Sequence, residues 1–142
     1  DGSASAVIAN QAFIQSRNLK PISKIIAAAS CGIDPKMMGL GPVPAILYLL
    51  EMTGLKISDI GLFEINEAFS TQYLACQKEL GFDPAIGNVN GGAVALGHPL
   101  GASGTRIVLA LIYELKRRNK KFGATSVCIG GGQGIAAIWE IV

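Results

Sequence analysis

The sequence predicts an α/β domain built on a mixed, five-stranded sheet with helices on both faces. Short apolar runs alternate with segments whose apolar residues recur at helical spacing, which is the rhythm of strand-helix units. Half of the 142 residues are hydrophobic, only 15% are charged and 18 are glycine, which favours tightly packed layers over disorder or a coiled coil. The last two apolar runs are joined by so short a glycine turn that they are expected to be antiparallel neighbours.

The elements follow in order along the chain. Strands are predicted at residues 3–9, 25–33, 60–65, 125–129 and 135–142. The second run is apolar throughout, as expected of a strand in a sheet that is covered on both faces. The predicted helices are a short one at residues 10–17, one opened by Pro42 and Pro44 and stopped by Gly54, one with Phe69, Tyr73, Cys76 and Leu80 on a single stripe, and a long one that ends in Lys116, Arg117 and Arg118.

Composition and charge limit the class of protein. No apolar run reaches the roughly 18 residues of a membrane span and no signal peptide opens the chain, so we expect no membrane partner. The net charge of +2 is too small to indicate a nucleic-acid partner. The three cysteines match no zinc pattern, which predicts free thiols in a reducing compartment, and we expect the cytoplasm. Because the chain opens with Asp1 rather than Met, we expect a piece of a longer protein.

The only histidine, His98, stands between a glycine-rich approach and a proline-led segment, in the stretch NVNGGAVALGHPLGASGTR at residues 88–106. Pro99 suits the first position of a helix, and a residue before proline is kept out of the α region, so His98 is expected at the mouth of the long helix. The positive end of the helix dipole disfavours the imidazolium there, which favours a neutral ring that can accept a proton. A general base and a structural capping histidine both fit this position.

Two further polar clusters follow predicted strands. Asn66 and Glu67 come directly after the third strand, and Cys128 lies at the end of the fourth, just before the glycines of residues 130–134. Sites in open α/β sheets form beyond the carboxyl ends of strands, and free N–H groups of a glycine turn can receive an oxyanion. The structural alternatives are a helix cap for Asn66, a buried thiol for Cys128 and a plain hairpin for the glycines. The glycines fit no nucleotide-binding motif, and a lone histidine with scattered cysteines does not indicate a metal site.

Three motifs together resemble those of a known family. NEAF at residues 66–69, GGAVALGHPLGASG at residues 91–104 and CIGGGQG at residues 128–134 are similar, in order and separation, to the C-terminal half of the thiolases. Thiolases are acyl-CoA C-acetyltransferases that make or cleave 3-ketoacyl-CoA. The resemblance covers essentially the whole chain and implies the thiolase fold, in which two similar βαβαβαββ core domains pack together. Residues 1–142 would form the second of these domains.

The resemblance implies a role for each motif in a Claisen condensation or its reversal, with coenzyme A thioesters as substrates and no further cofactor or metal. His98 would be the general base that activates a nucleophilic cysteine. Cys128 would be the second thiol, which takes the α-proton in synthesis and returns it in cleavage, because a thiol's pKa can be lowered toward neutrality. Asn66 would hold a water that binds the enolate oxygen together with His98, and the N–H of Gly130 would form part of the hole for the tetrahedral intermediate.

Three other residues are implied to contact or support the substrate. Ala68 and Phe69 would line the pantetheine channel. Glu67, which we group with them, would support the site in a role that the resemblance does not specify.

The chain departs from the family in what it lacks. Neither Cys31 nor Cys76 matches the setting of the acyl-accepting cysteine of thiolases, and the loop domain that grips coenzyme A is absent. We therefore expect the chain to be inactive alone and to require an N-terminal thiolase half, in a homodimer or homotetramer of the full enzyme. The alternative is a module that keeps the thiolase fold for packing or dimerisation without catalysing a reaction.

Overall fold

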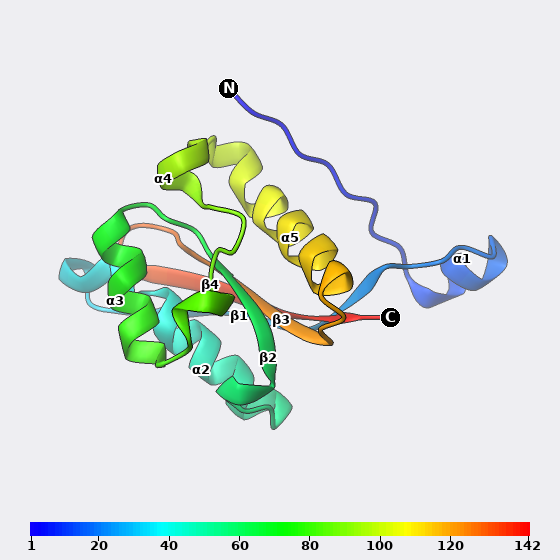
Figure 1. Ribbon diagram of the computed structural model, residues 1–142, viewed down its shortest axis with the longest axis horizontal. Helices are drawn as coiled ribbons and strands as arrows, with labels where there is room; N and C mark the ends of the chain where they lie inside the picture. The colour runs from blue at the N-terminus through cyan, green and yellow to red at the C-terminus, as the bar shows by residue number, and fades with distance from the viewer.

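The computed structural model describes residues 1–142 and contains a four-stranded mixed sheet in the order β1-β4-β3-β2 (Figure 1). The strands are β1 (Ser23–Gly32), β2 (Ile60–Ile65), β3 (Phe122–Cys128) and β4 (Gln133–Ile141). β2 and β3 are parallel, whereas β4 is antiparallel to both β3 and β1. The predicted α/β class and the predicted antiparallel pair at the end of the chain are thus confirmed.

The helices begin and end largely where the sequence predicts. They are α1 (Gln11–Ser16), α2 (Pro42–Thr53), α3 (Ser70–Leu80), α4 (Ala93–Leu96) and α5 (Leu100–Arg117). Gly54 and Gly81 stop α2 and α3 with φ of 69°, a left-handed conformation that glycine adopts without strain. Pro99 is the N-cap of α5 rather than its first residue, and the short α4 was not predicted. None of these helices is long and apolar enough to cross a membrane.

Helices cover both faces of the sheet, as predicted. Adjacent residues of β3 point to opposite faces, so Ala124 joins the main core with α2 and α3 while Gly123 faces α5. A Cβ on Gly123 would lie 2.7 Å from the side chain of Leu115, so the glycine lets α5 approach the sheet closely. Leu62 of β2 packs against Leu111 and Leu115 of α5 in a second, smaller core.

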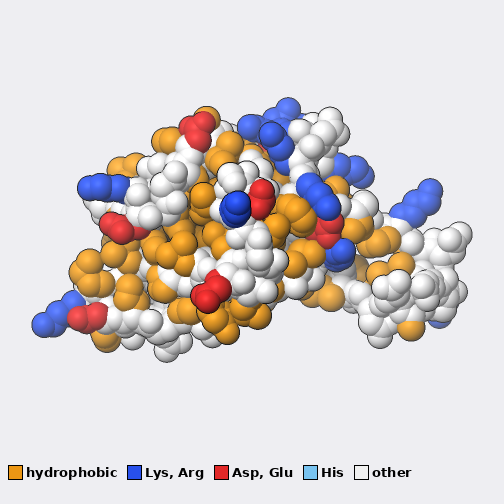
Figure 2. All heavy atoms as spheres, turned by 90° about the horizontal axis from the view of Figure 1, so that it is seen from below, with side chains coloured by type: hydrophobic (Ala, Val, Ile, Leu, Met, Phe, Trp, Pro, Cys, Tyr) orange, Lys and Arg blue, Asp and Glu red, His pale blue; other side chains and the backbone are white.

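Residues 3–9 do not form the predicted first strand, so the sheet has four strands rather than five. Val7 and Ile8 in this segment are 94% and 83% exposed. We call residues 1–18 the N-terminal arm; its first three residues lie near the turn that leads into α5, and its other end, which contains α1, projects from the body of the protein (Figures 1 and 2). The apolar pattern identifies a segment that a sheet neighbour would stabilise, but no strand of this chain pairs with it.

One half of the sheet face that α5 packs on is uncovered. α5 packs on β2 and β3, while Ile25 of β1 and Ile135 of β4 are 49% and 44% exposed. A crevice of about 180 Å³ runs between α5 and β4 and includes Ile135 and Trp139. We call this surface the open sheet face. The prediction that residues 25–33 are covered on both faces is therefore wrong for this chain, since β1 contains no buried residue.

Candidate active site

The carboxyl ends of β2 and β3 bring Asn66 and Cys128 to the same edge of the sheet. Ile65 is paired with Ser126, and the N–H of Asn66 continues the ladder by donating to the carbonyl of Ser126 at 2.9 Å. Cys128 is the last residue of β3, two positions beyond that bond. Parallel strands end at a common edge, which is where α/β proteins place their sites.

His98 reaches this edge from the turn before α5. Its Nε2 lies 3.2 Å from Nδ2 of Asn66, and its Nδ1 lies 2.6 Å from Oγ of Ser103. Because the Ser103 hydroxyl donates its single proton to the carbonyl of Pro99, it accepts from the ring, and this hydrogen-bond pattern assigns the ring proton to Nδ1. Nε2 then accepts from the Asn66 amide. The nitrogen that can take up a proton is the one that faces Asn66.

The Asn66 side chain is almost fully buried, with 1% of its surface exposed. Its Oδ1 has no hydrogen-bond partner within the chain. A buried acceptor without a partner is costly, so Asn66 is suited to a donor from outside the chain, such as a substrate or a water. The alternative that Asn66 is a helix cap is wrong, because the N-cap of α3 is Phe69 and the Asn66 side chain contacts His98.

Cys128 is half-buried, and burial raises the pKa of its thiol. The structure therefore differs from the expectation of a lowered thiol pKa: within this chain the sulfur is protonated at neutral pH. All three cysteines are free, and no group of three His, Cys, Asp or Glu side chains is close enough together to hold a metal ion.

The glycine turn after Cys128 has an unusual backbone. Gly130, Gly131 and Gly132 have φ of 97°, 62° and 85°, which side chains with a Cβ rarely adopt. The N–H of Gly130 has no hydrogen-bond partner in the chain. A residue outside the turn also fixes it, because the N–H of Ile33, just after β1, donates to the carbonyl of Gly132 at 2.7 Å. It is more constrained than a plain hairpin and keeps a free donor beside Cys128.

Ala68 and Phe69 lie in the short turn between Asn66 and α3. The N–H of Ala68 donates to Oε1 of Gln72 at 3.2 Å, which fixes the turn, and Phe69 is 61% exposed. Glu67 points elsewhere: its carboxylate accepts from Asn88 and from the main chain at the start of α4.

Sequence reasoning missed two residues that hold the site together. Ser103 bonds the ring of His98, and its signal was a polar residue one turn into the helix that the histidine opens. Asn88 bonds both the N–H and the carbonyl of Ile65 through its side chain, at 2.9 and 2.8 Å. The sequence carried no signal for Asn88: even its positive φ of 43° in the folded chain is shared by Asn18 and Asn119.

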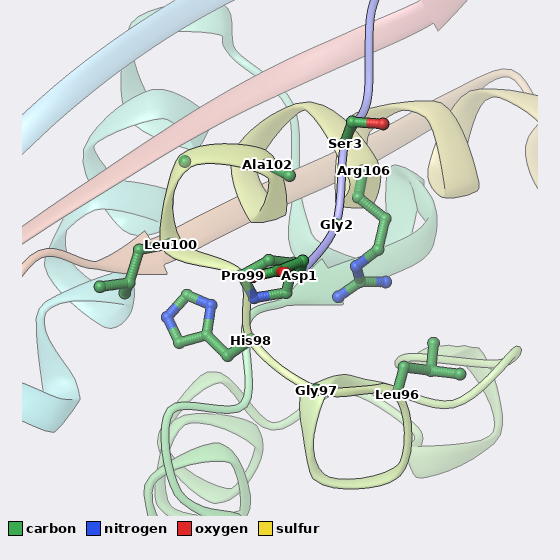
Figure 3. A pocket seen from close by; sticks show the side chains of 11 residues that line it. Asp1, Gly2, Ser3, Leu96, Gly97, His98, Pro99, Leu100, Ala102 and Arg106 are labelled. Carbon is green, nitrogen blue, oxygen red and sulfur yellow. The ribbon is translucent and has the colours of Figure 1, made fainter.

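A cavity of about 640 Å³ adjoins His98, between the first three residues and the turn that leads into α5. Figure 3 shows the imidazole of His98 and the guanidinium of Arg106 on opposite sides of the chain at Pro99. Neither Asn66, Cys128 nor Gly130 lines this cavity. We therefore place the site on the side of the imidazole where Nε2 meets Asn66, because that side carries the convergent polar groups.

This arrangement of parallel strand ends, an amide-imidazole pair and a glycine turn defines the carboxyl-terminal domain of a thiolase. The family described as thiolase, C-terminal domain, matches residues 19–141, and the chain belongs to it. The N-terminal arm, residues 1–18, lies outside the matched residues.

Relatives of this chain are full thiolases. The mitochondrial 3-ketoacyl-CoA thiolase of Bos taurus is 51% identical over 140 residues, which are 99% of this chain and 35% of that protein. The acetyl-CoA acetyltransferase of Shinella zoogloeoides is 50% identical over 140 residues, 99% of this chain and 36% of that protein. The crystal structure of human mitochondrial 3-ketoacyl-CoA thiolase matches with a TM-score of 0.92 and 48% identity, over 94% of this chain and 34% of that one. The chain thus spans about a third of the length of these relatives.

Proposed function

We propose that this chain is the carboxyl-terminal part of an acyltransferase that condenses two acyl-CoA thioesters, or cleaves a 3-ketoacyl-CoA with coenzyme A. The observation that carries the proposal is the 3.2 Å contact between Nε2 of His98 and Nδ2 of Asn66, at the edge where β2 and β3 end. A module that served only for packing would gain nothing from leaving the buried Oδ1 of Asn66 without a partner. The enzyme is therefore favoured over the inert module.

The first half of the reaction transfers an acyl group. Nε2 of His98 accepts the proton of a cysteine thiol supplied by the rest of the enzyme, and the thiolate attacks the carbonyl carbon of acyl-CoA. The carbon-sulfur bond to coenzyme A breaks, and the leaving thiolate needs a proton. Cys128 can supply it, since burial raises its pKa and keeps it protonated. Cys128 is left as a thiolate.

The second half forms the carbon-carbon bond. The Cys128 thiolate removes the α-proton of a second acyl-CoA, and the enolate oxygen is bound by protonated His98 and by Asn66, through its amide or a water that it holds. The α-carbon attacks the acyl thioester, and the N–H of Gly130 stabilises the tetrahedral oxyanion. When that intermediate releases 3-ketoacyl-CoA, the freed cysteine thiolate regains its proton from His98. No further cofactor is required in this scheme.

The acyl-accepting cysteine is proposed to come from an N-terminal half. Cys76 has no exposed surface, burial raises its pKa to about 11, and its thiol donates to the carbonyl of Gly39. Cys31 packs against the main core. The open sheet face beside α5, with Ile25 and Ile135 exposed, is the surface that we propose the missing half covers.

The remaining proposals concern the channel, the assembly and the location. Ala68 and Phe69 are proposed to line the pantetheine channel, since they lie beside Asn66 and Phe69 is exposed. We also propose a cytoplasmic homodimer or homotetramer of the full enzyme. The free cysteines support a reducing compartment. Fractionation of the cell and the mass of the native assembly test location and assembly.

A chimera tests the proposed function. Residues 1–142 replace the matched segment of the Shinella zoogloeoides acetyltransferase, and thiolysis of acetoacetyl-CoA is followed by the loss of its enolate absorbance. We expect activity from the chimera and none from the chain alone. His98→Asn and Cys128→Ala should each lower kcat by about 100- to 10,000-fold, whereas the control Cys31→Ala should not. Turnover by the chain alone, or near-normal turnover by either site variant, contradicts the proposal.

A further inference from the structure

Glu67 connects the two segments that carry the amide and the imidazole of the site. Its Oε1 accepts from Nδ2 of Asn88 at 2.8 Å, and its Oε2 accepts from the main-chain N–H of Val94 at 3.0 Å. Asn66 directly precedes Glu67, and His98 follows Val94 by four residues. The carboxylate therefore lies between the end of β2 and the segment that leads to His98.

Asn88 fixes the first of these contacts to the sheet. Its side chain bonds the N–H and the carbonyl of Ile65, and its own N–H donates to the carbonyl of Phe63 at 2.8 Å. Gly87 next to it forms a parallel bridge with Phe63. One end of the Glu67 contact is thus as rigid as the edge of β2 itself.

The second contact fixes α4. The N–H of Val94 is one of the first-turn donors that a helix cannot satisfy internally, and Glu67 satisfies it with a charged acceptor. Gly92 packs so closely on this carboxylate that a Cβ there would overlap its atoms. Gly92 has φ of −123°, which any residue adopts, so the close approach of Glu67 is what requires glycine at this position.

We propose that Glu67 is a positioning residue, which sets the separation between Nδ2 of Asn66 and Nε2 of His98 by holding the start of α4 against the end of β2. A role in binding substrate directly is disfavoured, because each carboxylate oxygen already accepts a hydrogen bond from the chain. The inference rests on the proposed function for its kinetic consequence, but the separation itself is a property of this chain.

Glu67→Gln tests the contact with little change of shape. Both partners of Glu67 are donors, so the NH₂ group of a glutamine must face one of them and one bond is lost. In the chimera we expect kcat to fall about 10- to 100-fold with KM within about twofold, because the groups that bind the enolate are displaced while the substrate channel is unchanged. Gly92→Ala, which displaces the carboxylate without removing it, should have the same effect. The matched control is Glu79→Gln on the exposed side of α3.

A second measurement does not depend on activity. His98 is the only histidine, so the ¹⁵N signals of its ring can be read without ambiguity in the 142-residue chain. We expect one ring state with the proton on Nδ1 in the wild type, and shifted or broadened ring signals in Glu67→Gln and Gly92→Ala. Unchanged ring signals in both variants, or an unchanged kcat in an active chimera, overturn the inference. If the wild-type chimera is inactive, the proposed function fails, while the ring signals still decide the role of Glu67.

Discussion

The buried carboxyl of Glu64 should make the free energy of unfolding fall as the pH rises from about 5 to 7. Glu64 lies on β2 with 3% of its surface exposed, and its pKa is raised from 4.5 to about 7. Burial is the largest cause, Glu67 and Glu114 add to it, and Arg106 opposes it. Between these two pKa values the folded chain holds a proton that the unfolded chain has released, so stability decreases with pH there. At about 1.4 kcal/mol per pH unit the full loss is about 3 kcal/mol.

Urea unfolding of the wild type and of Glu64→Gln, measured at intervals from pH 4.5 to 8, tests this reasoning. The amide has no charge to bury, so the stability of the variant relative to the wild type should increase by about 2 to 3 kcal/mol across the window and remain constant above it. Taking the difference between the two proteins cancels the other titrating groups. The hydrogen bond with Arg117 lowers the pKa of Glu114 to about 2. Glu114 therefore changes the free energy of unfolding mainly below pH 4.5, outside the range that is measured. Two curves that stay parallel from pH 5 to 7 would refute a buried, protonated Glu64.

Three further predictions follow from single contacts. Ser103→Ala should lower the kcat of the chimera about tenfold and release the ring proton of His98 from Nδ1, which ring ¹⁵N signals detect; an unchanged tautomer would contradict our assignment. Gly134→Ala should cost about 2 kcal/mol or more in urea unfolding, since its Cβ would overlap the backbone before α2, whereas the control Gly104→Ala meets nothing within 4 Å and should be neutral or stabilising. Ile135→Lys on the open sheet face should leave the chain folded but prevent an active chimera from forming, and equal activity would place the missing half elsewhere.

The sequence predicted those elements whose limits are set by local sterics. Gly54 and Gly81 end their helices because a left-handed residue costs glycine little, and Pro99 opens the last helix because its φ is already fixed. Such features depend on a few neighbouring residues. They were therefore visible without knowing what lies beside them in space.

The predicted first strand failed for the opposite reason. Residues 3–9 have the apolar character of a strand, but a strand exists only beside a partner, and the four strands of this chain leave it unpaired. The apolar run at residues 25–33 is a strand, yet its predicted cover is missing on one face. An apolar pattern indicates that a surface is buried in the complete assembly. It does not indicate which segment or which chain covers that surface.

The sequence by itself determined the chemical groups of the site and their order along the chain, because the motifs that contain Asn66, His98 and Cys128 are local and specific. Only the tertiary structure decided how they are oriented: that Ser103 holds the ring proton on Nδ1, and that Glu67 joins α4 to the end of β2. Both hydrogen bonds depend on tertiary packing, because the positions of their partners are set by how α5 and the turn at Asn88 pack on the sheet. Hydrogen bonds between segments depend on distances of a few tenths of an ångström, which periodicity and composition do not encode.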